Sequence, residues 1–129
     1  MNNRLAWGLL LALGCNSAMA QWVKIASNES SVFYIDPSAS KKVGDHVMIL
    51  ILRDHTSVQY DRAELYLSSK DEIEVDCTGK RVRRIYSSDH PQHMGRGNFV
   101  YSEHGPMSWN KAAPKTILRR IVDIACLIS

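Results

Sequence analysis

The spacing of apolar residues changes once along this chain, at Thr116. After Thr116 the apolar side chains recur every three to four residues, which predicts an amphipathic helix, and Thr116 itself can cap the first turn. Its apolar face would carry Ile117, Leu118, Ile121, Ile124, Ala125 and Ile128. Before Thr116 the apolar residues come in short runs separated by turns, as in strands. The change in period therefore predicts a sheet with one helix packed on it.

The short runs predict strands at residues 22–26, 32–35, 47–52, 63–67, 73–77, 82–86 and 99–102. The unbroken apolar run at 47–52 is typical of a central strand covered on both faces. Residues 68–71 are expected to form a turn and residues 88–97 a loop. Strict alternation in the strand at 82–86 would place Val82, Arg84 and Tyr86 on one face, with Arg81, Arg83 and Ile85 on the other.

The first residues have the layout of a secretory signal peptide. Arg4 precedes an apolar stretch at 5–13, and Ala18 and Ala20 occupy the small-residue positions of a cleavage site. We expect a cleaved segment at 1–20 and a single domain at 21–129, with no transmembrane segment left, because the apolar stretch is far shorter than the ~20 residues of a spanning helix. Acylation of Cys15 is the alternative, although Ala12 stands where a lipoprotein signal has leucine.

Cleavage would remove Cys15 and leave one pair of cysteines, Cys77 and Cys126. In an oxidising compartment these two should form a disulfide that joins the helix to the end of a strand. Closing this long loop would stabilise the fold by roughly 4 kcal/mol in the chain-entropy model. Two buried free thiols are the alternative.

The charge of the chain argues against a nucleic-acid partner. Cleavage removes only one cation, Arg4, so the formal charge falls from +3 to +2, without the basic excess of a nucleic-acid-binding protein. The one dense basic cluster, at Lys80, Arg81, Arg83 and Arg84, is expected to face away from the acidic run at 71–76. It could bind sulfated glycans or an acidic stretch of a partner protein, or it could be an edge strand protected by charge.

Motifs for catalysis, metals and cofactors are missing from the sequence. It has no G-x-S-x-G or H-E-x-x-H motif, and both mature cysteines are assigned to the bridge, so we expect a protein without enzymatic activity or cofactor. His90, His93 and His104 suggest a metal site around one loop, but no cysteine or acidic residue completes a known ligand spacing. We favour the interpretation that these three histidines lie in a polar surface loop and do not bind a metal. Trp22 and Trp109 are interpreted as core or sheet-covering aromatics.

The order of several short motifs resembles a known family. These motifs are Trp22 near the mature start, Tyr34-Ile35-Asp36-Pro37, Asp76-Cys77 followed by basic residues and Tyr86, a Gly-rich turn, Trp109, and a terminal helix with Cys126. The succession resembles the surface-adhesin protein E family of bacterial envelope proteins over almost the whole mature chain. The resemblance implies an antiparallel sheet joined to a C-terminal helix by the cysteine pair. It also implies homodimers and attachment to host proteins such as vitronectin and laminin.

We therefore expect an α+β fold, with an antiparallel sheet of about five to six strands packed against one C-terminal amphipathic helix. The expected function is adhesin-like binding of a protein partner, such as a host extracellular-matrix protein, by an exported envelope protein. The expected location is the periplasm or the outer cell surface. A periplasmic structural or accessory protein is the alternative.

Overall fold

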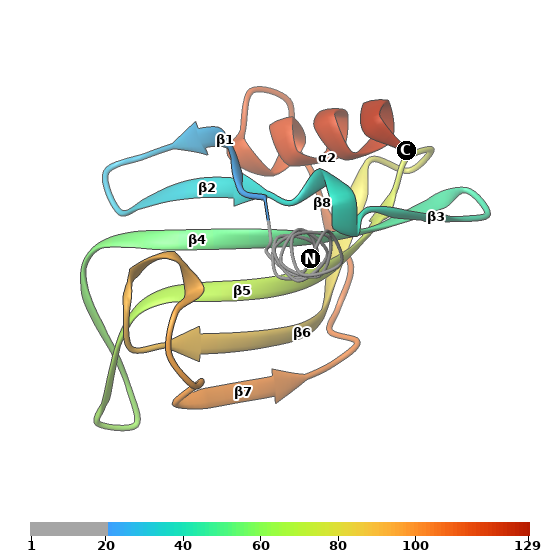
Figure 1. The fold of residues 1–129 in the computed structure, drawn as a ribbon. Coiled ribbons are helices and arrows are strands. Elements are labelled where there is room, and N and C mark those ends of the chain that lie inside the picture. The colour runs from blue at the N-terminus through green and yellow to red at the C-terminus, as the bar shows by residue number, and fades with distance from the viewer. Residues whose placement is uncertain (1–20) are drawn as a thin grey trace, which may run out of the picture.

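The computed structural model describes residues 21–129 and shows an antiparallel sheet with one α-helix on it (Figure 1). The expected signal peptide and the alternative lipid site at Cys15 lie outside the described residues. The main path of the sheet has the order β1-β2-β4-β5-β6-β7, with β3 paired to β4 and β8 paired to β6. The strands are β1 (Val23–Ser27), β2 (Ser31–Ile35), β3 (Lys41–Val43), β4 (His46–Asp61), β5 (Glu64–Asp76), β6 (Arg81–His90), β7 (Tyr101–His104) and β8 (Asn110–Lys111). The helices are α2 (Ile117–Ile128) and the short 3-10 helices η1 (Pro37–Ala39) and η2 (His93–Gly95).

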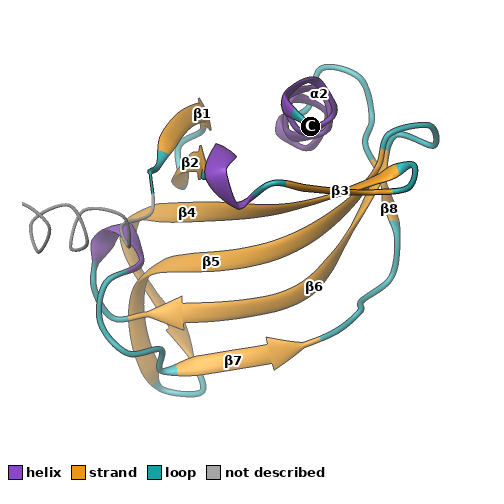
Figure 2. Ribbon diagram, turned by 45° about the vertical axis from the view of Figure 1, so that its right-hand side comes forward, coloured by secondary structure: helices purple, strands orange, loops and turns teal. Residues whose placement is uncertain are grey.

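The hydrophobic core lies between α2 and one face of the sheet, which we call the helix face. Successive strand residues point to opposite faces, so every second residue of β4 and β5 contributes to this core. Figure 2 shows α2 beside β1 and β2, with β5 to β7 extending away from it. The buried core comprises Ile25, Ile35, Val47, Ile49, Ile51, Ile73, Val75, Val82, Ala112, Ile121, Val122 and Ala125.

The helix prediction is confirmed at its start and over most of its apolar face, although Ile128, which was assigned to that face, is 41% exposed. The Thr116 hydroxyl accepts a hydrogen bond from the Arg119 backbone N–H at 3.1 Å, which satisfies one of the unpaired donors of the first turn. Ile121 and Ala125 are buried as expected, and so is Val122, which was not assigned to the apolar face. The expected disulfide is also present, since Cys77 and Cys126 are bonded and their Cα atoms lie 5.9 Å apart.

The prediction of a turn at 68–71 is wrong, because β5 runs unbroken through these residues. Ser68, Ser69 and Asp71 are buried, which a short polar run does not suggest. Their burial is tolerated because each is hydrogen-bonded. Ser68 donates to the Gln92 carbonyl at 2.5 Å, and Ser69 donates to Asp89 at 2.7 Å.

The central strand prediction at 47–52 is confirmed for the helix face, and the other face is covered unevenly. Met48 and Leu50 are half-buried there, whereas Leu52 is fully buried. Leu52 lies beneath the loop that contains η2, where a Cβ placed on Gly95 would lie 3.3 Å from a Leu52 methyl group. The loop itself begins only after His90, three residues later than expected, because β6 is longer.

Candidate partner-binding face

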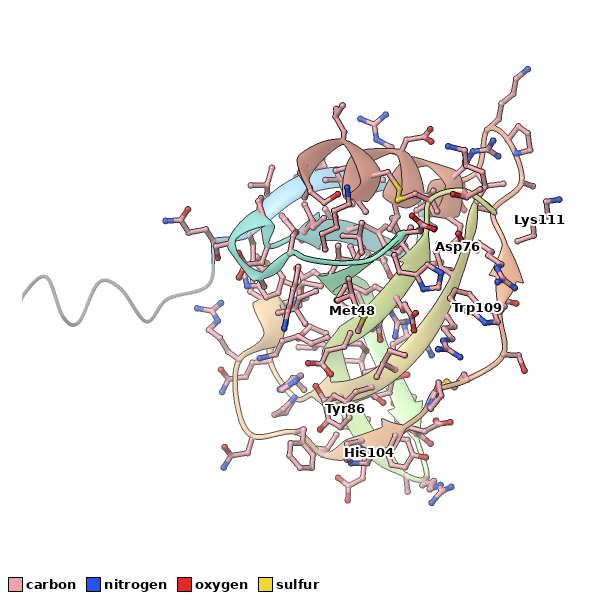
Figure 3. All side chains as sticks on the ribbon, turned by 90° about the vertical axis from the view of Figure 1, so that its right-hand side faces the viewer. Met48, Asp76, Tyr86, His104, Trp109 and Lys111 are labelled. Atoms are coloured by element: carbon pink, nitrogen blue, oxygen red, sulfur yellow. A yellow bond between two sulfur atoms is a disulfide. The ribbon has the colours of Figure 1, made fainter. Side chains whose placement is uncertain are left out.

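The face of the sheet opposite the helix carries cross-strand rows of polar and aromatic side chains, and we call it the open face. Directly paired residues of antiparallel strands point to the same side, so the register defines these rows. The row nearest the strand ends holds Val43, His46, Asp76, Arg81 and Lys111. The next holds Lys41, Met48, Glu74 and Arg83, and the third holds Leu50, Glu72, Tyr86 and His104. Figure 3 looks onto this face.

Trp109 lies over the first two rows and is held by two guanidinium groups. The Arg81 and Arg83 guanidinium carbons lie 4.4 Å and 4.5 Å from its ring centroid, within the range of cation–π attraction. The His46 ring meets the indole edge-on, with the centroids 5.6 Å apart. A half-buried tryptophan with three ring contacts is restricted in orientation, so it presents a fixed aromatic surface.

Two carboxylates in the same rows hold these arginines in place. The Nε of Arg81 donates to Asp76 at 2.8 Å, and the Nε of Arg83 donates to Glu74 at 2.9 Å. His46 also contacts Glu74, with 2.5 Å between Nδ1 and Oε2. The arginines therefore stack on Trp109 in positions that are set by strand pairing.

The ionisation of both carboxylates reflects these contacts. Burial raises the pKa of Glu74, but the hydrogen bonds from His46 and Arg83 outweigh this and leave the pKa below its usual value. The Arg81 hydrogen bond, followed by one from the Gly79 backbone, lowers the pKa of Asp76. Both groups therefore remain anionic at neutral pH and keep the two arginines in place.

The middle of the open face is more apolar. Tyr86 and His104 stack at a tilt, with their ring centroids 4.7 Å apart. Beside them a shallow hollow of about 160 Å³ is formed by Met48, Leu50 and Glu72 against η1. The face therefore combines a charged aromatic end with a partly apolar centre.

The structure separates the four basic residues that the sequence put together. Arg81 and Arg83 lie on the open face, whereas Arg84 lies on the helix face, where its Nε is 3.4 Å from Asp71. Lys80 is in the turn before β6, with a positive φ of 53°. The expectation that this cluster faces away from the acidic run at 71–76 is wrong, because the three arginines pair with three acids of that run.

A bulge in β6 also changes which side chains share a face. Ile73 pairs with Arg84 and Glu72 pairs with Tyr86, so Ile85 is an extra residue without a partner on β5. Tyr86 consequently lies with Arg83 on the open face and not with Val82 and Arg84, as strict alternation predicted. The sequence carries no strong signal for this bulge, because no glycine marks it.

The three histidines of the suggested metal site have separate partners. His90 is buried and bonds the Gly97 carbonyl at 2.9 Å through Nδ1, His93 contacts Asp54 at 3.0 Å, and His104 stacks on Tyr86. Within residues 21–129, no group of three or more histidine, cysteine, aspartate or glutamate side chains is arranged to hold a metal ion.

A buried polar network occupies the helix face beyond the reach of α2. His55 contacts the Ser31 hydroxyl at 2.9 Å and the Ser69 hydroxyl at 3.1 Å, and Ser69 in turn donates to Asp89. Burial lowers the pKa of His55, so its ring is neutral at pH 7. Ser31 is only 6% exposed, which leaves no approach for a substrate to its hydroxyl. We interpret this network as structural.

Comparisons with known proteins agree on one family. A family model described as surface-adhesin protein E matches residues 22–127. No curated protein matches the chain. No helix in the described part of the chain is long and apolar enough to cross a membrane.

Solved structures of Haemophilus influenzae protein E share the fold. One is 13% identical over 85% of this chain and 86% of that chain, with a TM-score of 0.64. A second crystal form is 13% identical over 85% of this chain and 97% of that chain, with a TM-score of 0.61. The protein from a non-typeable strain is 13% identical over 85% of this chain and 78% of that chain, with a TM-score of 0.59.

Proposed function

The chain belongs to the surface-adhesin protein E family, and from this premise we propose that it is an exported, non-enzymatic envelope protein whose open face binds a macromolecular partner. The observation that carries the proposal is Trp109, held between Arg81 and Arg83 on the sheet face opposite α2 (Figure 2). Tryptophan and arginine are the residues most enriched at binding hot spots. Their fixed arrangement also reduces the entropy that binding would cost.

The charge around Trp109 indicates the chemistry of the partner. Arg81 and Arg83 are already paired with Asp76 and Glu74. Lys111 is exposed at the end of the first row, and Lys41 is exposed at the end of the second row, on the other side of the face. A partner surface with an apolar anchor for Trp109 and acidic groups at its rim would complement this face.

We propose a protein partner of this kind, and a host extracellular-matrix protein is the form that the family name suggests. The test is solid-phase binding of the mature, oxidised protein to immobilised laminin and vitronectin. Trp109→Ala should weaken binding by roughly tenfold to a hundredfold, the loss typical of a hot spot. Tyr60→Ala is the matched control, because Tyr60 is an aromatic residue that is 73% exposed and lies at the opposite end of β4 from His46. Equal binding by both variants would refute the assignment of this face.

The alternative, a periplasmic accessory protein, makes a different prediction about location. Protease treatment of intact cells should remove the protein while a periplasmic control protein survives. Survival of both proteins would refute outer-surface exposure and favour the periplasmic role. The homodimer that the family resemblance implies stays a prediction, which sedimentation velocity of the mature chain would check.

A further inference from the structure

The strand β1 forms one edge of the sheet, and part of its backbone faces outward. Ala26 is paired with Phe33 of β2, and the Asn28 N–H bonds the Ser31 carbonyl at 3.0 Å, so Ala26 and Asn28 point toward β2. Because the backbone N–H and C=O groups of successive strand residues point in opposite directions, those of Ser27 point away from β2, toward the outer edge of the sheet. The Ile25 carbonyl also points outward, where it accepts a hydrogen bond from the Arg120 side chain.

A groove runs between this edge and α2. It has a volume of about 670 Å³ and is lined on one side by residues 25–27 of β1. The other side is formed by α2, including Arg120, Ile124 and Leu127. The volume lies within the roughly 300–1,000 Å³ that binding sites usually have. The groove therefore joins outward-facing strand backbone to a helical wall.

The helical wall combines apolar surface with positive charge. Leu127 is 83% exposed, which is unusual for a leucine on a helix that packs against a core. The cations Lys115, Arg119 and Arg120 line the groove together with a single carboxylate, Asp123. A ligand that fits must offer backbone hydrogen bonds, apolar side chains and negative charge.

We propose that this groove binds an extended acidic peptide segment of a partner protein, which adds to the sheet as a new strand beside β1. Addition of a strand satisfies the outward N–H and C=O of Ser27, and alternate side chains of the peptide contact Ile124 and Leu127. Arg120 holds the Ile25 carbonyl in the free protein and turns to a peptide carboxylate in the complex. This site lies at the opposite edge of the sheet from Trp109 and β8, so it goes beyond the proposed function of the open face.

The test uses the mature, oxidised protein and a fluorescein-labelled ten-residue peptide of alternating valine and glutamate. Fluorescence anisotropy should show saturable binding of this peptide and none of a valine–lysine peptide of equal length. Ser27→Pro removes the outward N–H without touching the bonds to β2, since proline is accepted where the N–H faces solvent. It should weaken binding roughly tenfold through loss of a hydrogen bond and the strand contact beside it, whereas Ser27→Ala should bind as the wild type does.

A second variant tests the helical wall without disturbing the core. Leu127→Asp should also weaken binding, while Trp109→Ala should leave it unchanged, which separates this site from the open face. The thermal midpoints of all variants establish that they are folded. The proposal is overturned if the acidic peptide does not bind or if Ser27→Pro binds as well as Ser27→Ala. It is also overturned if the wild type is a dimer that Ser27→Pro converts to a monomer, because β1 of a second copy would then occupy the groove.

Discussion

The disulfide between Cys77 and Cys126 should stabilise the protein chiefly by restricting the unfolded chain. The two residues are separated by 49 positions, and the loop-entropy relation gives about 4 kcal/mol at 25 °C for a loop of this length. Replacement of both cysteines by alanine avoids a reactive free thiol and should remove this contribution. The loss is large beside the roughly 5–15 kcal/mol of total stability that is usual for a domain.

Urea denaturation followed by far-UV circular dichroism measures this loss. With a slope of about 2 kcal/mol per molar urea, a loss of about 4 kcal/mol moves the midpoint down by about 2 M. The wild-type protein under reducing conditions should unfold at nearly the same urea concentration as the double variant. A midpoint shift below about 0.5 M, or a reduced wild type as stable as the oxidised one, would refute the reasoning.

Three further predictions concern the helix face and the helix cap. Burial lowers the pKa of His55 below its unfolded value. The contribution of His55 to stability is therefore complete above about pH 6.5 and is lost as the pH falls toward the folded pKa. His55→Gln should flatten the pH dependence of the unfolding free energy between about pH 7.5 and 5. Asp71→Ala should lower the unfolding free energy by about 3 kcal/mol, because the Arg53 guanidinium, which lies 2.6 Å from Asp71 in the wild type, loses its partner. A decrease of less than about 1 kcal/mol in urea unfolding would contradict this. Thr116→Ala should lower stability by about 1 kcal/mol through loss of the cap, whereas Thr116→Ser should be nearly neutral in the same assay.

The local features of this fold could be predicted from the sequence because their causes lie within a few residues. The helix at 117–128 follows from the spacing of its apolar residues, and its start follows from Thr116. The disulfide follows from the number of cysteines that the expected signal cleavage would leave. These features require no knowledge of which strands pair.

The features that depend on strand register could not be predicted. Ser68 and Ser69 have the polar sequence of a turn, but they lie within β5. Their hydroxyl groups donate hydrogen bonds to partners 24 and 20 residues away in sequence. The ion pairs of Arg81 and Arg83 exist because β5 and β6 pair in one register, and a shift by one residue would point these side chains to the other face. Trp109 lies on the open face just before β8. This strand has two residues, which is too short to give a periodic pattern in the sequence.

We propose that the open face around Trp109 meets a partner in the cell envelope. The most direct measurement places a photo-crosslinking amino acid at Lys111, which is exposed beside Trp109, and at Tyr60 as the control, in cells that export the protein. We predict a discrete crosslinked product from position 111 that disappears when Trp109→Ala is added, and no such product from position 60. Absence of a product from position 111, or the same product from both positions, would contradict the claim.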